Sequence, residues 1–288
     1  MQKQNNQSTS EFYLGTADEY METTSFNTTG QLTWPAAMKL FDFLCSTTKK
    51  EDAEDFLDTD TKSMNVFGKK KKKKNIIELG SGNGWLAMQL LTNYDEDIYY
   101  IATEMENGGA LDWLERIIEE NVRRNLFRND VKIKCKALDW NAVDEFDLGV
   151  LRENDDDEDK DDRNEKKKKK FDLILGSDLV YEESGVKLLP KVIKRLLREK
   201  CEKEAYMLYS HTKHRYDAMD CDFLENLEVE GLECVEVRIR DEELPPSPPP
   251  FSSLFPEQRI AIYRISLFAN KEEEENTIED RYTSRYRN

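Results

Sequence analysis

One stretch, Asn75–Met88 (NIIELGSGNGWLAM), constrains the fold of this chain more than any other. Its apolar first residues are typical of a buried strand, and WLAM is typical of the start of a helix. Between them lie three glycines in five residues, which permit a tight turn and let the backbone approach a ligand closely. The stretch therefore predicts an α/β fold with a ligand-binding turn at a strand end.

The rest of the chain repeats the alternation of strand and helix. Apolar runs predict strands over residues 75–79, 98–103, 131–137, 171–175 and 205–210. Helical spacing predicts helices over residues 32–45, 85–92, 111–125, 186–198 and 216–230. Two final alternating strands, 234–240 and 259–267, have no helix between them. The pattern predicts a doubly wound, mostly parallel, seven-stranded sheet with an antiparallel last hairpin, a Rossmann-like fold.

Charged and proline-rich runs mark the limits of the expected domain. We expect residues 30–268 to form one domain, with low-complexity inserts at 49–74 and 152–170 and a proline-rich loop at 241–256. These runs contain too little apolar surface to form a packed core. Residues 1–29 are expected to be a partly disordered extension, and residues 269–288 a charged disordered tail.

The net charge of −17 restricts the classes of partner. Broad binding to nucleic acid needs a basic face, so a nucleic-acid partner is not expected. Two lysine runs, at residues 69–74 and 166–170, could instead serve as local phosphate patches or nuclear-import signals, or simply as solvated loops. No segment is apolar enough to span a membrane, and no leader or metal motif is evident. We expect a cytoplasmic, possibly also nuclear, monomer that binds no metal.

The glycine turn, Gly80–Gly84, has the spacing G-x-G-x-G. Most dinucleotide sites have G-x-G-x-x-G instead. Glu104 ends the second predicted strand, where its carboxylate could accept hydrogen bonds from ribose hydroxyls, and Glu78 stands just before the turn. S-adenosylmethionine (SAM), which has no pyrophosphate, fits these features better than NAD. A NAD site and a tight connection without any ligand remain alternatives.

Polar and aromatic residues follow the third and fourth predicted strands. Asp139 and Trp140 could contact an adenine, or could be a helix cap and a core residue. Asp178 and Tyr181 lie three residues apart at the next strand end, where a capping Asp and a packed Tyr are the alternative. His211 could line the mouth of a site, although we expect it on a solvated loop.

Several of these segments together resemble the seven-β-strand methyltransferases of methyltransferase family 16. The resemblance rests on IIELGSGNGWLAM, the strand end at Glu104, KALDWN, FDLILGSDLVYEE and the segment GQLTWPAAMKLFDFL, and it covers roughly residues 30–268. Most characterised members methylate a lysine of another protein, often a translation factor or a chaperone, and some methylate histidine. DLVY resembles the acid-x-x-aromatic motif of the family.

The resemblance implies a role for each matching position. Trp34 would lie against the cofactor, Gly80, Ser81 and Gly82 would hold its methionine part, and Glu104 its ribose. Trp140 would flank the adenine with Asp139 near it, and Ser177 would contact the cofactor through its backbone. Asp178 and Tyr181 would be the catalytic residues that face the substrate.

The sequence therefore predicts an enzyme that transfers a methyl group from SAM to a protein side chain, with lysine as the first choice. A methyltransferase that acts on nucleic acid or a small molecule is one alternative. A non-catalytic scaffold that retains the fold is the other.

Overall fold

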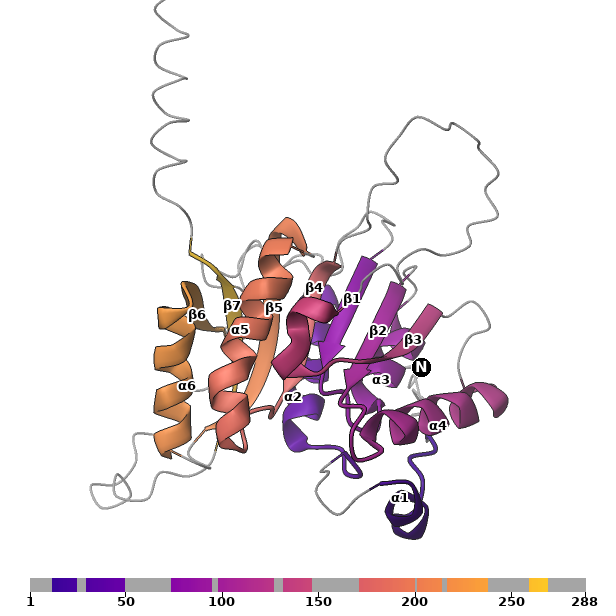
Figure 1. Cartoon of the computed structure of the whole chain (residues 1–288). Helices are drawn as coiled ribbons and strands as arrows, with labels where there is room; N and C mark the ends of the chain where they lie inside the picture. Colours follow the sequence, from indigo (N-terminus) through magenta and orange to yellow (C-terminus); the bar gives the residue numbers. More distant parts are fainter. Residues whose placement is uncertain are drawn as a thin grey trace, which may run out of the picture.

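The computed structural model describes residues 12–24, 30–49, 74–94, 98–126, 132–146, 171–199, 201–213, 217–237 and 259–268. Within these residues a seven-stranded sheet has the order β3-β2-β1-β4-β5-β7-β6 (Figure 1). Its strands are β1 (Lys74–Leu79), β2 (Ile98–Glu104), β3 (Lys132–Ala137), β4 (Phe171–Ser177), β5 (Cys201–Lys213), β6 (Leu232–Val237) and β7 (Arg259–Leu267). The predicted fold is confirmed.

Strands β1 to β5 are parallel, so their carboxyl ends share one edge of the sheet. The register pairs Leu79 with Gly176 and Ser177 with Ser210. Strand β7 is antiparallel to both of its neighbours and lies between β5 and β6. The strand order reverses between β1 and β4, the position where ligands bind in such sheets.

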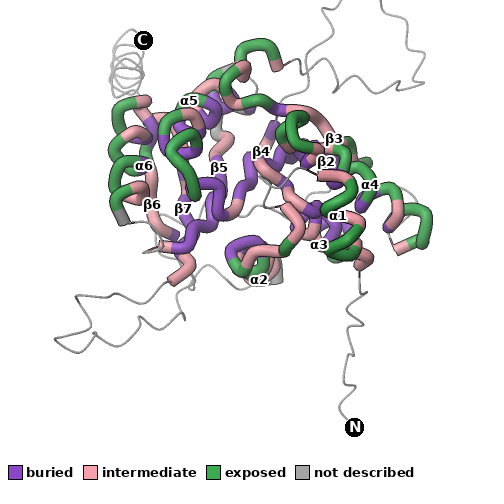
Figure 2. Tube along the Cα trace, turned by 60° about the horizontal axis from the view of Figure 1, so that its bottom comes forward, coloured by how far each residue is buried: buried purple, intermediate pink, exposed green. Residues whose placement is uncertain are grey.

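Helices cover both faces of the sheet (Figure 2). They are α1 (Ala17–Thr23), α2 (Pro35–Lys49), α3 (Trp85–Asn93), α4 (Ala110–Arg123), α5 (Glu183–Glu199) and α6 (Asp217–Val229), with a 3₁₀ helix, η2 (Trp140–Glu145). Ile76 and Leu175 join the core beneath α2, α3 and α4, whereas their neighbours Ile77 and Ile174 join the core beneath α5 and α6. This alternation follows from the two-residue period of a strand.

Helix α5 continues through Pro190, which cannot donate the hydrogen bond that the carbonyl of Val186 would otherwise accept. The side-chain amide of Asn226 on α6 donates to that carbonyl instead, at 3.3 Å. A contact between helices thus compensates for the missing hydrogen bond, so the helix predicted over 186–198 runs through the proline.

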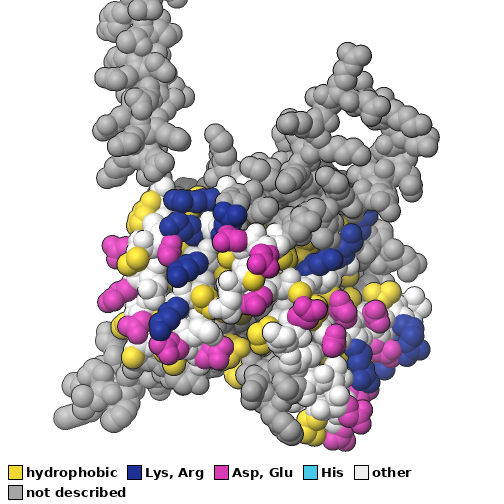
Figure 3. Space-filling model, in the orientation of Figure 1, with side chains coloured by type: hydrophobic (Ala, Val, Ile, Leu, Met, Phe, Trp, Pro, Cys, Tyr) yellow, Lys and Arg dark blue, Asp and Glu magenta, His cyan; other side chains and the backbone are white. Residues whose placement is uncertain are grey.

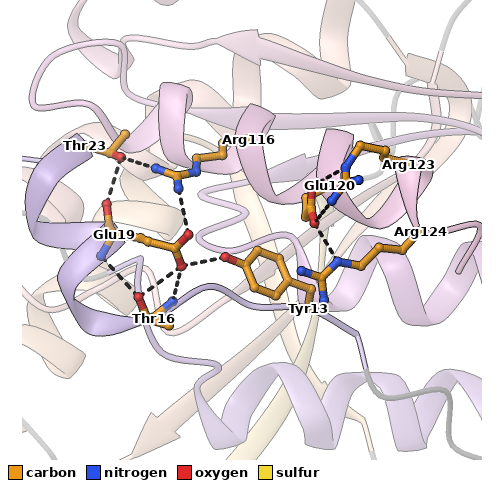
Figure 4. Close-up of polar contacts among 8 residues, drawn as sticks. All are labelled: Tyr13, Thr16, Glu19, Thr23, Arg116, Glu120, Arg123 and Arg124. Carbon is orange, nitrogen blue, oxygen red and sulfur yellow. Dashed lines mark hydrogen bonds and ion pairs between the residues drawn. The ribbon is translucent and has the colours of Figure 1, made fainter.

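Residues 12–24, with α1, pack on α4, and the sequence analysis did not anticipate this helix. The side chain of the fully buried Asn121 on α4 accepts from the backbone N–H of Tyr13 at 2.9 Å and donates to its carbonyl at 2.7 Å. The hydroxyl of Tyr13 donates to Glu19, which also pairs with Arg116, and the guanidinium of Arg124 lies 4.0 Å from the Tyr13 ring centre (Figure 4). The amino-terminal segment is therefore fixed along the middle and the end of α4.

The charged inserts lie outside the described residues, except Lys49 and Lys74, which end α2 and begin β1. The predicted loop at 241–256, the tail at 269–288 and His214 also lie outside them. None of the described helices combines the length and apolar character needed to cross a bilayer.

Candidate active site

A cavity opens at the carboxyl ends of β1 to β4. Its wall is formed by the segments that follow these strands, together with residues before α2. The predicted site residues that line it are Trp34, Gly80, Gly82, Glu104, Asp139, Trp140, Ser177, Asp178 and Tyr181. Glu78 and Ser81 are not part of the wall. The structure thus brings together residues that are spread over almost 150 positions of the sequence.

The glycine turn needs its glycines for both conformation and space. Gly80, Gly82 and Gly84 have φ angles of 59°, 56° and 72°, in the left-handed region that favours glycine. A Cβ atom at Gly80 would lie 2.6 Å from the side chain of Leu179. A Cβ atom at Gly30 would lie 3.2 Å from the Cα of Gly82. The segment before α2 therefore lies directly against the turn.

The turn is also tied to β2. Oε1 of Glu104 accepts a hydrogen bond from the N–H of Gly82 at 2.7 Å. Burial raises the pKa of Glu104, and the hydrogen bonds from the N–H groups of Gly82 and Met105 oppose that rise. The N–H of Ser81 donates to the carbonyl of Thr103, whose own N–H donates to Oγ of Ser81. Ser81 therefore shapes the turn rather than lining the cavity.

Glu78 lies beneath the turn and is buried. The hydroxyl of Tyr100 donates to its carboxyl at 2.9 Å. Burial raises the pKa of Glu78 to about 8, an effect that the hydrogen bond from Tyr100 partly offsets. At neutral pH this side chain is therefore mainly a neutral acid that supports the turn from below.

Asp139 and Trp140 follow β3 at the start of η2. Oδ1 of Asp139 accepts from the N–H of Asn141 at 2.8 Å, so this residue caps the short helix. Its carboxyl is exposed and also lines the cavity. Trp140 is half-buried rather than a core residue. Both side chains are thus available at the cavity wall beyond β3.

Asp178 is held rigidly in an unusual conformation. Its φ angle is 49°, and only one other described non-glycine residue has a positive φ. Its two carboxyl oxygens accept hydrogen bonds from the N–H and the hydroxyl of Thr212, at 2.7 and 2.8 Å. Strained residues of this kind cluster at functional sites. Tyr181, three residues on, is 41% exposed and stands at the mouth of the cavity rather than in the core.

The prediction that His211 lies on a solvated loop is wrong. His211 belongs to β5 and is buried, as are its neighbours Ser210 and Thr212, because this strand is covered on both faces. Its ring contacts Tyr209 and Asp220 and takes no part in the cavity wall. The predicted strand ended at residue 210, whereas β5 continues to Lys213 and includes His211.

Asn83 is a site residue that the sequence analysis missed. It is buried, and its side-chain amide donates to the carbonyl of Gln31 at 3.2 Å and to Oγ1 of Thr33 at 3.0 Å. It therefore fastens the segment that carries Trp34 to the glycine turn. Its partners lie about fifty positions earlier, so sequence spacing gave no sign of the contact.

The cavity wall is acidic. Four carboxyl groups line it, those of Glu104, Asp139, Asp178 and Glu182, and no Lys, Arg or His occurs among its described lining residues. Such a wall favours a cationic ligand. No group of three or more His, Cys, Asp or Glu side chains in the described segments is arranged to hold a metal ion.

A comparison with protein families gives the site its chemistry. The model of the lysine methyltransferase family, methyltransferase family 16, matches residues 18–155 and 156–230. The chain belongs to this family. It is therefore a SAM-dependent methyltransferase, as the sequence analysis predicted.

One individual relative of this methyltransferase has low sequence identity to it. It is 26% identical over 257 residues to an uncharacterized protein of Dictyostelium discoideum, which covers 84% of this chain. The chain spans about 60% of the length of that relative.

Solved structures of methyltransferases are also similar, at low sequence identity. A human methyltransferase 10 domain containing protein has a TM-score of 0.41 at 12% identity, with 83% of this chain and 85% of the other covered. A METTL16 methyltransferase domain has a TM-score of 0.44 at 12% identity, with 83% and 84% covered. Aeropyrum pernix fibrillarin with bound SAM has a TM-score of 0.39 at 15% identity, with 67% of each chain covered.

The residues of the cavity fit the cofactor of the family. SAM carries a sulfonium charge, which suits a wall that has four carboxyl groups and no basic side chain among its described residues. Gly80 and Gly82 line the cavity without side chains, so a ligand can lie close to the backbone of the turn, and α3 begins directly after it, where the end of a helix favours an anionic group.

Proposed function

We propose that this methyltransferase transfers the methyl group of SAM to the lysine amine of another protein. The observation that carries the proposal is the pairing of Asp178 with Tyr181 at the mouth of an acidic cavity. A carboxylate and an exposed aromatic ring, with no basic side chain among the described lining residues, suit an approaching cation such as lysine.

In this proposal the cofactor is held by residues from five segments. The backbone of Gly80, Ser81 and Gly82 receives the methionine part, and the carboxylate of Glu104 receives the ribose hydroxyls. Asp139 and Trp140 take the adenine, Ser177 contacts the cofactor through its backbone, and Trp34 closes the site from the amino-terminal side. Glu78 contributes indirectly, because it is buried under the turn and bonded to Tyr100.

The bound cofactor supplies an electrophilic methyl group on a sulfonium centre. The lysine nitrogen would form the new bond with its lone pair as the carbon–sulfur bond breaks, and the electron pair of the broken bond would remain on sulfur. The methylated ammonium product then releases a proton to water. No covalent bond to the enzyme is needed, so the side chains act by alignment.

The amine must be neutral when it reacts. Deprotonating a free lysine, whose pKa is about 10.4, costs roughly 4–5 kcal/mol at pH 7. A nearby carboxylate favours the charged amine, so Asp178 cannot lower this cost. We assign Asp178 to orienting the amine, since Thr212 already fixes its carboxylate. Tyr181 offers a ring face to the cationic centre.

We propose a protein acceptor such as a translation factor or a chaperone, in the cytoplasm or nucleus. The mixed charge of the face seen in Figure 3 supports a protein over a nucleic acid. On the face in Figure 3, Lys and Arg side chains over α5 and β3 are bordered by Asp and Glu rather than joined into one basic surface.

The test is to incubate the full chain with SAM labelled in its methyl group and a cell extract. We expect label in protein that survives nuclease, is lost with protease, and is recovered as methyl-lysine after acid hydrolysis. Label in nucleic acid, in small molecules or in methyl-histidine would contradict the lysine assignment.

Two variants separate binding from transfer in this assay. Asp178→Ala should lose methyl transfer and keep most of its SAM affinity, because it removes the orienting carboxylate and its hydrogen bonds with Thr212 but leaves the residues assigned to the cofactor unchanged. Gly82→Arg should lose SAM binding as well, because a side chain at φ 56° would have to enter the space beside Gly30. Equal loss of binding and transfer in Asp178→Ala would refute its role as an orienting group.

A further inference from the structure

A hydrogen-bonded series of buried side chains lies behind the cavity wall and ends at the loop that carries Asp178 and Tyr181. It starts at Asp220 on α6, whose Oδ1 lies 2.8 Å from Nε2 of His211. Nδ1 of His211 lies 3.1 Å from the hydroxyl oxygen of Tyr209. That oxygen accepts a hydrogen bond from the backbone N–H of Leu179 at 3.2 Å. None of the three side chains lines the cavity, whereas Leu179 does.

The hydrogen bonds of this series all point the same way, each donor facing toward Asp220. The carboxylate of Asp220 can only accept, so the proton of the facing histidine nitrogen lies on Nε2. In that tautomer Nδ1 of His211 accepts from the hydroxyl of Tyr209, and the phenol oxygen is left to accept from Leu179. Burial raises the pKa of Tyr209 well above its ordinary value, so the phenol keeps the proton that it donates.

Packing against neighbouring rings keeps the hydrogen-bonded side chains in place. The rings of Tyr209 and His211 are stacked, with centroids 5.5 Å apart, and the ring of Phe223 meets Tyr209 edge-on at 5.6 Å. Phe223 lies one turn after Asp220 on α6, so one face of that helix provides both the aromatic contact and the carboxylate. The side chains of His211 and Asp220 are only 6% and 16% exposed.

The loop at the other end needs such support. Asp178 has a left-handed φ of 49°, a conformation that persists only where the surroundings enforce it. Its own N–H donates to the carbonyl of Ser210 at 2.9 Å, and the next N–H, that of Leu179, donates to Tyr209. The two peptide groups on either side of the strained residue are thus fixed by consecutive residues of β5.

We propose that Tyr209, His211 and Asp220 are positioning residues for methyl transfer, acting through the N–H of Leu179 to hold Asp178 and Tyr181 in their working arrangement. This inference rests on the proposed roles of Asp178 and Tyr181. This hydrogen-bonded series makes α6, which contributes none of the described lining residues of the cavity, part of the machinery that aligns the substrate.

The decisive variant is Tyr209→Phe, which removes one oxygen atom and keeps the ring that packs on Phe223. It leaves the N–H of Leu179 without its partner, so we expect hydrogen exchange in the peptide that contains residues 177–181 to quicken about tenfold or more. Labelled-methyl transfer from saturating SAM to a fixed protein extract should slow by at least about tenfold, because misalignment is costly in such reactions. SAM affinity, measured by calorimetry, should stay that of the wild type.

Asp220 offers a test by rescue. Asp220→Asn keeps an oxygen that accepts from His211, so exchange and transfer should resemble those of the wild type. Asp220→Leu removes the acceptor and should reproduce Tyr209→Phe. Asp222→Leu, at an exposed position of the same helix, is the matched control and should change neither measurement.

The exchange and transfer measurements separate this inference from the proposed function. If the wild-type protein transfers no methyl group, the proposed function fails. Amide exchange alone then decides whether the hydrogen-bonded series holds the loop. Unchanged exchange and transfer in Tyr209→Phe would overturn the inference. So would an Asp220→Asn variant as impaired as Asp220→Leu.

Discussion

Glu78 makes the stability of this protein depend on pH in a way that one substitution can isolate. The side chain is buried under the glycine turn, and its pKa is raised from 4.5 to about 8, mainly because burial disfavours the charged form. Between these two values the folded protein holds a proton that the unfolded chain releases. The free energy of unfolding must therefore fall as the pH rises through this window.

The size of the effect follows from the same two values. Each pH unit in the window costs about 1.4 kcal/mol, and the slope flattens as the folded-state pKa is approached. From pH 6 to pH 8 the contribution of Glu78 should therefore amount to about 2 kcal/mol. Glu78→Gln cannot titrate, and its amide oxygen still accepts from Tyr100. Relative to the wild type, this variant should gain about 2 kcal/mol over that range.

Urea unfolding at pH 6, 7 and 8, at constant ionic strength, measures this difference directly. Glu106→Gln, at an exposed position just beyond β2, serves as a control that also loses one carboxyl group. Parallel pH profiles for the wild type and Glu78→Gln would refute the reasoning, because they would mean that Glu78 titrates alike in the folded and unfolded protein.

Two further substitutions test the glycine turn and its contact with the amino-terminal segment. Gly80→Ala places a Cβ atom 2.6 Å from Leu179 at a φ of 59°, and should destabilise the fold by about 1–3 kcal/mol in urea unfolding. Gly231→Ala, at a φ of 76° with open space around it, carries the strain without the clash, so equal losses would show that the Leu179 contact is unimportant. Asn83→Ala removes the hydrogen bonds that hold residues 31–33, and calorimetry should show SAM affinity reduced about tenfold. Undiminished affinity would mean that this segment takes no part in binding.

The fold was predictable because its signals are local. Apolar runs that alternate with segments of helical periodicity predicted the parallel strands. Two alternating segments with no helix between them predicted the final hairpin. The glycine turn and Glu104 can likewise be identified from the sequence of one strand and the residues just beyond it. The structure then brings their neighbours together for a topological reason, since parallel strands end at one edge.

The contacts that the sequence did not reveal join distant polar residues. The backbone N–H of Tyr13 donates to the side chain of Asn121, 108 positions later, and no periodic pattern in the sequence predicts such a pair. His211 was misplaced because the fifth strand was predicted to end at residue 210, whereas β5 continues to Lys213. Its partner Asp220 comes from the following helix and satisfies the ring in the interior.

The cavity at the strand ends is proposed to bind SAM, with Glu104 as the carboxylate that receives the ribose. Calorimetric titration of the full chain with SAM, for the wild type and for Glu104→Ala, tests it most directly. We expect one site in the wild type and an affinity at least about tenfold weaker in the variant, because a charge-assisted hydrogen bond is lost. A wild-type chain that does not bind SAM, or a variant that binds it equally well, would contradict the account.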